Sequence, residues 1–131
     1  MLITPQKLFL NLFADKETTS FPAGQFVFKS GEPGQTMYIV MEGEVEILDG
    51  SIILEVAGPG SMVGELALID DEPRSASVMA KTDCRLVPVD RKRFQYMTQE
   101  TPFFALAVMK VLADRLRNKN VRTRSSLQME A

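Results

Sequence analysis

A glutamate and an arginine nine residues apart carry the clearest chemical signal in the sequence. Glu65 follows Gly64 at the start of a short apolar run with helical character, and Arg74 follows Pro73 where a strand is expected to begin. Free amide groups at a helix start favour a bound anion, and a guanidinium can bond two oxygens of one phosphate. A carboxylate repels phosphate, so we expect Glu65 to accept a hydrogen bond from a neutral donor such as a sugar hydroxyl.

The stretch from Gly64 to Ser77 reads Gly-Glu-Leu-Ala-Leu-Ile-Asp-Asp-Glu-Pro-Arg-Ser-Ala-Ser. It resembles the phosphate-binding cassette of cyclic nucleotide-binding domains, which occur in protein kinase A regulatory subunits, the catabolite activator protein and cyclic-nucleotide-gated channels. The spacing of the glutamate and the arginine is similar to the kinase and channel version of the cassette. Matching glycines upstream extend the resemblance to about residues 20–118.

The resemblance implies cyclic AMP or cyclic GMP as the ligand and a role for each cassette residue. Arg74 pairs with the monoanionic cyclic phosphate, and Glu65 accepts from the ribose 2′-hydroxyl. Ser75 bonds the phosphate or, as in relatives that prefer cyclic GMP, the guanine amino group. Backbone amides of Leu66, Ala67 and Ala76 complete the cradle. The expected binding set is Val63, Gly64, Glu65, Leu66, Ala67, Arg74, Ser75 and Ala76.

This hypothesis makes two structural demands. The guanidinium of Arg74 must face a cavity, and the carboxylate of Glu65 must not be held in a salt bridge elsewhere. The adjacent acidic residues Asp70, Asp71 and Glu72 must point to solvent, because inward they would cancel the charge of the arginine.

Composition narrows the function further. The chain has 131 residues, a formal net charge of −2, no histidine and one cysteine. The missing histidine removes the commonest metal ligand and general base, so we expect no metal, no prosthetic group and no enzymatic activity. Cys84 is expected to be a buried reduced thiol. The net charge gives no general attraction to nucleic acid or anionic membrane.

No apolar run approaches the length of a membrane crossing, and Met1 to Phe13 lacks the pattern of a signal peptide. We therefore expect a cytoplasmic protein without a membrane segment. The start at Met1, with a tidy first helix behind it, favours a complete small protein over an excised domain.

The elements that position the cassette are short strands punctuated by turn residues. Asp49-Gly50 is typical of a tight hairpin, and Pro33-Gly34 suits the centre of a type II turn. Many short strands at regular spacing predict a rolled antiparallel sheet. The fold class is therefore α+β: an antiparallel β-roll (double-stranded β-helix, jelly-roll-like) flanked by an N-terminal helix and two C-terminal helices.

We expect one cyclic nucleotide-binding domain over residues 1–131. Its expected parts are a helix at 4–14, the roll at 20–89 with the cassette at 64–77, C-terminal helices within 90–120 and a frayed tail at 121–131. The sequence permits a contact between a base in the pocket and Thr123 or Ser125 of the tail, and leaves open whether the tail makes one.

The second C-terminal helix, over residues 101–120, has a predicted apolar face of Phe103, Leu106, Met109, Leu112, Ala113 and Leu116. This face either packs on the roll or, as the resemblance implies, covers the nucleotide or pairs with its copy in a homodimer.

The chain has no room after this helix for the helix-turn-helix of catabolite activator relatives, so we expect no DNA binding. Five basic residues cluster near the end of this helix: Arg115, Arg117, Lys119, Arg122 and Arg124. We attribute this cluster to a solvated helix end, where positive side chains complement the helix dipole.

These observations predict a non-enzymatic sensor of cyclic AMP or cyclic GMP that moves its C-terminal helices to signal to an effector protein or a dimer partner. The alternatives are an interaction or dimerisation module of the same fold with an unused pocket, and the isolated regulatory domain of a channel or kinase.

Overall fold

The computed structural model describes residues 3–130, with side chains described through residue 119. The elements in chain order are α1 (Pro5–Leu12), β1 (Thr19–Phe21), β2 (Phe26–Phe28), β3 (Thr36–Glu42), β4 (Val45–Asp49), β5 (Ile52–Ala57), β6 (Met62–Val63), α2 (Leu66–Asp70), β7 (Ser77–Ala80), β8 (Cys84–Asp90), α3 (Arg91–Glu100) and α4 (Pro102–Glu130).

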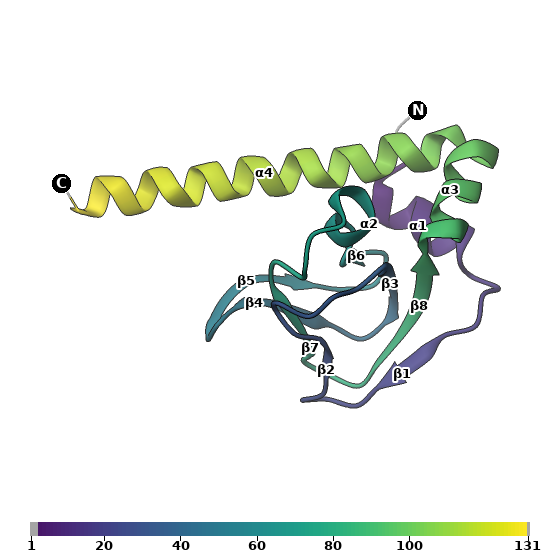
Figure 1. The fold of residues 1–131 in the computed structure, drawn as a ribbon, viewed down its shortest axis with the longest axis horizontal. Helices are drawn as coiled ribbons and strands as arrows, with labels where there is room; N and C mark the ends of the chain where they lie inside the picture. Colours follow the sequence, from purple (N-terminus) through teal and green to yellow (C-terminus); the bar gives the residue numbers. More distant parts are fainter. Residues whose placement is uncertain (1–2, 131) are drawn as a thin grey trace.

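The strands form two four-stranded antiparallel sheets with the orders β1-β8-β3-β6 and β2-β7-β4-β5. The two sheets face each other as a roll, and α2 lies at one edge of it (Figure 1). The long antiparallel pair β3–β8 runs in register from Thr36 opposite Asp90 to Val40 opposite Leu86. The expected α+β roll with flanking helices is confirmed.

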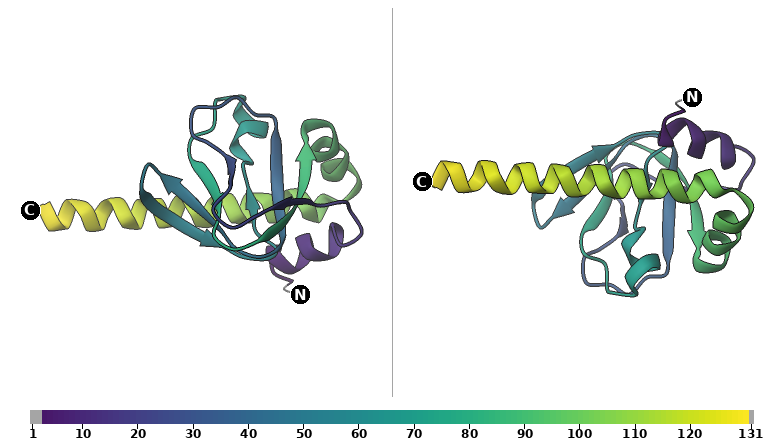
Figure 2. Two further views of the ribbon diagram at one scale, coloured as in Figure 1. Left: turned by 90° about the horizontal axis from the view of Figure 1, so that it is seen from below. Right: turned by 90° about the horizontal axis from the view of Figure 1, so that it is seen from above.

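α1 and α3 begin where the sequence supplies a capping side chain. Thr4 Oγ1 accepts from the amide of Lys7 at 3.2 Å, and Asp90 Oδ1 accepts from the amide of Arg93 at 2.8 Å. α1, α3 and the start of α4 gather at one end of the roll, and α4 then crosses the roll and extends beyond it (Figures 1 and 2).

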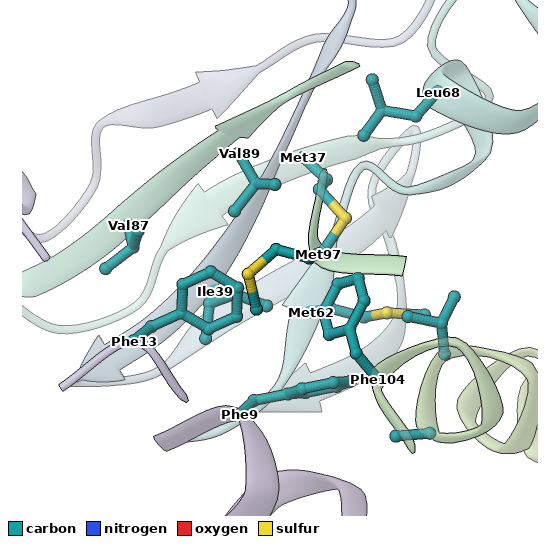
Figure 3. Close-up of a cluster of buried hydrophobic side chains, with 12 residues drawn as sticks. Phe9, Phe13, Met37, Ile39, Met62, Leu68, Val87, Val89, Met97 and Phe104 are labelled. Carbon is teal, nitrogen blue, oxygen red and sulfur yellow. The ribbon is translucent and has the colours of Figure 1, made fainter. Parts of the chain in front are cut away.

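Two hydrophobic clusters hold these layers together. One fills the roll between the sheets and includes Val40, Val45 and Leu86. The other joins β3, β6 and β8 to the helices and includes Phe104 of α4 (Figure 3). Phe104 makes edge-to-face contacts with the rings of Phe9, Phe13 and Phe94 at centroid distances of 5.7, 6.1 and 5.5 Å.

The packed face of α4 differs from the predicted one. Phe104, Ala107 and Val108 are buried against the body. Four of the six side chains that were expected to form the apolar face are exposed: Phe103, Leu106, Met109 and Leu116. α4 therefore carries two apolar faces, and periodicity alone identified the outer one.

α4 also continues to Glu130 instead of ending at 120 in a frayed tail. The sequence beyond 120 contains neither glycine nor proline to end a helix, and it includes Arg, Leu, Gln, Met and Glu, which are good helix formers. The side chains of Thr123 and Ser125 lie outside the described residues, so the structure does not test a contact between the tail and a base. α1 is shorter than the expected 4–14 helix, covering Pro5–Leu12.

Candidate functional site

The cassette forms a sharp connection between β6 and β7 with α2 inside it. Gly64 follows β6 and has a φ of +79°, a conformation that is strained for residues with a side chain, and a Cβ there would lie 2.7 Å from Arg74 Nη1. Glu65 is the N-cap residue of α2, but its side chain makes no capping hydrogen bond. Its carboxylate is therefore left to contacts outside the helix.

Arg74 is held inside the roll with 7% of its surface exposed. Nη1 donates to the carbonyl of Gly64 at 3.0 Å, and Nη2 donates to the carbonyl of Thr36 at 2.7 Å. Its Cζ lies 4.0 Å from the centroid of the Phe28 ring. Burial lowers the pKa of Arg74 from its ordinary value. Among the described residues, its buried Nε–H has no hydrogen-bond partner.

Gly34 makes room for this arginine. Its φ is not among the positive values that a type II turn needs at this position, so the predicted turn type is wrong. A Cβ on Gly34 would instead lie 2.4 Å from Arg74 Nε and 2.5 Å from Nη2. The glycine is required because the guanidinium passes directly over its backbone.

We therefore expect Gly34→Ala to displace the Arg74 guanidinium and to weaken any anion bound there about tenfold, since one charge-assisted hydrogen bond is worth about 1.5–3 kcal/mol. Gly58→Ala is the matched control, because a Cβ at Gly58 meets nothing within 4 Å. Calorimetric titration of both variants with cyclic nucleotide measures the difference. Equal affinities would contradict the steric role of Gly34.

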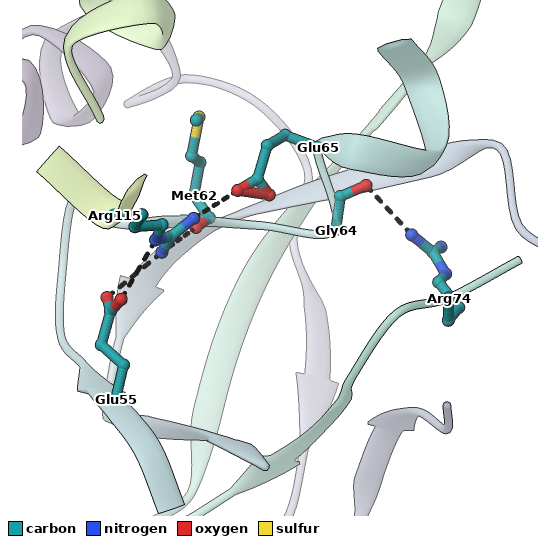
Figure 4. A network of polar contacts seen from close by, with 6 residues as sticks. All are labelled: Glu55, Met62, Gly64, Glu65, Arg74 and Arg115. Atoms are coloured by element: carbon teal, nitrogen blue, oxygen red, sulfur yellow. Dashed lines mark hydrogen bonds and ion pairs between the residues drawn. The ribbon is translucent and has the colours of Figure 1, made fainter. Parts of the chain in front are cut away.

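Glu65 is 5% exposed and forms an ion pair through Oε1 with Nη1 of Arg115, which comes from α4 (Figure 4). Arg115 also donates to both carboxylate oxygens of Glu55, at 3.1 and 3.2 Å, and to the carbonyl of Met62 at 2.7 Å. Burial would lower the pKa of Arg115, but the charges and hydrogen bonds of Glu65 and Glu55 outweigh it and raise that pKa.

This ion pair contradicts one demand of the sequence-based hypothesis, because Glu65 is held in a salt bridge. It also corrects the explanation of the basic cluster. Arg115 is not a solvated residue at a helix end: it is partly buried in an ion-pair network, and α4 continues past it. Arg117 is exposed and pairs with Asp114 at 3.6 Å. The side chains of Arg122 and Arg124 lie outside the described residues.

Arg74 and Arg115 both line a cavity of about 500 Å³. Every residue of the predicted binding set lines it: Val63, Gly64, Glu65, Leu66, Ala67, Arg74, Ser75 and Ala76. The structure thus brings the whole set together, and Arg74 faces a cavity as required. The acidic residues Asp70, Asp71 and Glu72 are exposed, also as required.

The rest of the lining was not predicted. It comes from β2, β4, β5, β7 and α4: Phe28, Ile47, Asp49, Leu54, Glu55, Val78, Arg115, Asn118 and Lys119. One signal for Arg115 was available, because it follows Phe104, Val108 and Val111 at helical spacing on the packed face of α4. A charge on a packed face requires a partner.

Other parts of the described structure show weaker signs of a functional site. A hollow of about 550 Å³ lined by residues of the α1–β1 connection, β3 and β8 contains none of the predicted site residues. Residues 3–119 contain no group of three or more side chains suited to hold a metal ion. Within the same range, no helix is long and apolar enough for a membrane crossing. Cys84 is buried, as expected, and burial raises the pKa of its thiol.

Comparison with known proteins gives consistent matches. Residues 18–101 match the family model described as the cyclic nucleotide-binding domain. A CRP-like cAMP-activated global transcriptional regulator of Mycobacterium tuberculosis is 37% identical over 109 residues, which are 79% of this chain and 49% of the regulator. A cAMP-dependent protein kinase regulatory subunit of Emericella nidulans is 40% identical over 81 residues, which are 60% of this chain and 20% of the subunit.

The catabolite activator protein of Thermus thermophilus superposes with a TM-score of 0.75 at 29% identity, covering 92% of this chain and 57% of that protein. The sequence thus spans about half the length of the transcriptional regulator and of the catabolite activator protein, and a smaller part of the kinase subunit. The expectation that the protein does not bind DNA finds no support here, because one relative is named a transcriptional regulator.

Proposed function

Because this chain belongs to the cyclic nucleotide-binding domain family, we propose that it is a regulatory module that binds cyclic AMP or cyclic GMP in the cavity between Arg74 and Arg115. Binding in this cavity changes the position of α4 and so signals to an effector protein or a dimer partner. The role is regulatory rather than catalytic, as the names of the transcriptional regulator and the kinase regulatory subunit indicate for those proteins.

The observation that carries the proposal is the buried guanidinium of Arg74, which borders a cavity of about 500 Å³ and retains an unused N–H donor. A buried polar group without a partner is uncommon and needs an explanation. Because this nitrogen is buried with no ligand present, the guanidinium must turn toward the cavity before a phosphate oxygen supplies the missing acceptor. The cavity volume also lies within the range of about 300–1,000 Å³ that is usual for small-molecule sites.

The cassette residues take the remaining contacts. The amides of Leu66 and Ala67 lie in the first turn of α2, where no intrahelical acceptor exists, so they are available to phosphate oxygens together with the amide of Ala76. Ser75 adds its hydroxyl.

Glu65 remains the acceptor for the ribose 2′-hydroxyl despite its ion pair. A carboxylate has two oxygens with about four lone-pair sites, and the contact with Arg115 uses Oε1.

Calorimetric titration with each cyclic nucleotide tests the proposal. Heat of binding with at least one of them is expected, with a rise in melting temperature that grows with nucleotide concentration. No heat with either nucleotide at millimolar concentration would favour the alternative, an interaction module of the same fold whose pocket is unused.

A homodimer through α4 stays a prediction. The exposed apolar side chains Phe103, Leu106, Met109 and Leu116 support it, because packing on the roll does not account for them. Sedimentation equilibrium is expected to give twice the mass of one chain. A single-chain mass at high protein concentration would contradict the dimer.

A further inference from the structure

Phe28 on β2 lies against the guanidinium of Arg74 inside the roll. Arg74 Cζ is 4.0 Å from the centroid of the Phe28 ring, and Phe28 also lines the cavity of about 500 Å³. A Cβ on Gly64 would lie 2.7 Å from Arg74 Nη1 and 3.0 Å from a ring carbon of Phe28. The ring, the guanidinium and the backbone before α2 therefore meet at one point of the cavity wall.

A bulge in β2 turns Phe28 toward the cavity. Phe26 lies opposite Met79, but Phe28, two residues later, lies opposite Val78, so β2 has one extra residue between the two pairs. Val78 is buried and lines the cavity, whereas Met79 does not line it. A bulge can re-aim a side chain in this way. Phe26 lies outside the cavity lining, and its ring has Lys29 Nζ 5.0 Å from its centroid instead.

Two further aromatic rings support Phe28. The ring of Tyr38 on β3 stacks on Phe28, with centroids 6.4 Å apart and an angle of 28° between the planes. Phe21 on β1 meets the Tyr38 ring edge-on at 6.1 Å. The three rings form a row that ends at the guanidinium of Arg74, so Phe28 is held in place from the side away from the arginine.

Arg74 is a buried cation that forms no salt bridge with any carboxylate of residues 3–119. Burial lowers its pKa, because the charged form loses contact with solvent. A carboxylate partner would compensate for this loss but would also repel the phosphate of a ligand. An aromatic face attracts a cation through its quadrupole and adds no net charge. The Phe28 ring therefore stabilises the guanidinium and leaves its charge available to an anion.

From this geometry we infer that Phe28 is a positioning residue that holds the Arg74 guanidinium at the cavity wall for the phosphate of the nucleotide, an inference that rests on the proposed function. Contact with the face of a ring attracts the cation without fixing the direction of its N–H groups. The guanidinium can therefore turn its donors toward a phosphate oxygen while it stays on the ring. Without the ring, Arg74 samples other orientations in the free protein, and ordering it on binding costs affinity.

Phe28→Leu tests the inference, because leucine keeps an apolar side chain at this position and removes the aromatic face. We expect its affinity for cyclic nucleotide, measured by calorimetric titration, to fall about 2-fold to 12-fold, which corresponds to the cost of ordering one long side chain. Phe26→Leu is the matched control, since Phe26 is half-buried on the same strand and also contacts a cation, but lies outside the cavity lining. It should bind like the wild type.

A double-mutant cycle with Arg74→Ala distinguishes positioning of the arginine from a direct contact between the ring and the ligand. If Phe28 acts through Arg74, Phe28→Leu lowers the affinity of the wild type and leaves the affinity of Arg74→Ala unchanged. An equal loss in both backgrounds would mean that the ring contacts the nucleotide itself, and would overturn the inference. A loss in Phe26→Leu as large as that in Phe28→Leu would overturn it as well.

The outcomes also distinguish the inference from the proposed function. A wild-type protein that binds neither nucleotide overturns the proposed function and the inference with it. A wild-type protein that binds, beside a Phe28→Leu variant whose affinity changes by less than twofold, overturns the inference alone. If Phe28→Leu does not fold, Phe28→Met replaces it with the same outcomes, because methionine also lacks an aromatic face and fills irregular gaps in a core. Arg74→Met takes the place of Arg74→Ala in the cycle if the alanine variant does not fold.

Discussion

Arg74→Ala is expected to weaken cyclic nucleotide binding about tenfold to a hundredfold, because a charge-assisted hydrogen bond contributes about 1.5–3 kcal/mol. The change removes the positive charge opposite the acidic residues of the cavity, and it removes the Nε–H donor that has no protein partner among the described residues. The proposed contact of Glu65 with the ribose is unaffected by this change, so we expect binding to weaken without being abolished. Calorimetric titration of the wild type and the variant measures the loss.

The variant must also be checked for folding. Alanine leaves the carbonyls of Gly64 and Thr36 without their present donor, and an unpaired buried polar group costs about 1–3 kcal/mol. Arg74→Lys separates the two effects, because it keeps the charge but cannot reproduce the fork between those carbonyls. Its affinity is expected to lie between those of the wild type and Arg74→Ala.

Arg85→Ala is the control for the loss of one positive charge. Arg85 is exposed on β8, bonds Thr18 at 3.0 Å and does not line the cavity beside Arg74. It should bind like the wild type. If Arg85→Ala and Arg74→Ala lose affinity equally, a general charge effect explains the result and the phosphate role of Arg74 is wrong.

The cassette could be predicted from sequence because its residues are close together along the chain. Gly64, Glu65 and Arg74 lie within one turn-helix-turn segment, so local rules for helix starts and turns are enough to bring them together. The same holds for the hairpin at Asp49-Gly50, where β4 and β5 pair with Asp49 opposite Ile52.

Contacts between distant segments were not predictable in this way. Arg115 lies 50 residues from Glu65 and 60 from Glu55, and their meeting depends on where α4 crosses the roll. The sequence suggested that Gly34 serves a type II turn. Its closeness to Arg74, which is 40 residues away, depends instead on the path of the arginine side chain. Sequence identifies the charged and flexible residues, and tertiary packing decides which of them meet.

The two apolar faces of α4 illustrate the same limit. Apolar residues occur almost all round the first turns of this helix, so helical spacing fits an outer face through Phe103 as well as an inner face through Phe104. Only the position of the helix against α1 and α3 selects Phe104 for the core. This choice is directly testable, because the two phenylalanines are adjacent in the sequence and opposite in burial.

Phe104→Ala is expected to destabilise the protein by about 3–5 kcal/mol, the usual cost of removing a buried aromatic ring and leaving a cavity. Phe104 is 0% exposed and contacts the rings of Phe9, Phe13 and Phe94, so its loss loosens α1, α3 and α4 together. For a chain of this length, the melting temperature should fall by roughly 10–25 °C. Thermal unfolding followed by circular dichroism measures the change.

Phe103→Ala removes the same number of atoms one position earlier, from a side chain that is 71% exposed. Its melting temperature in dilute solution is expected to change by no more than a few degrees, since surface substitutions usually cost within about 0.5 kcal/mol. Because the two variants have the same composition, their difference isolates the contribution of burial. Similar losses in both would mean that α4 does not dock through the face of Phe104, and the position of Arg115 over the cavity would lose its support.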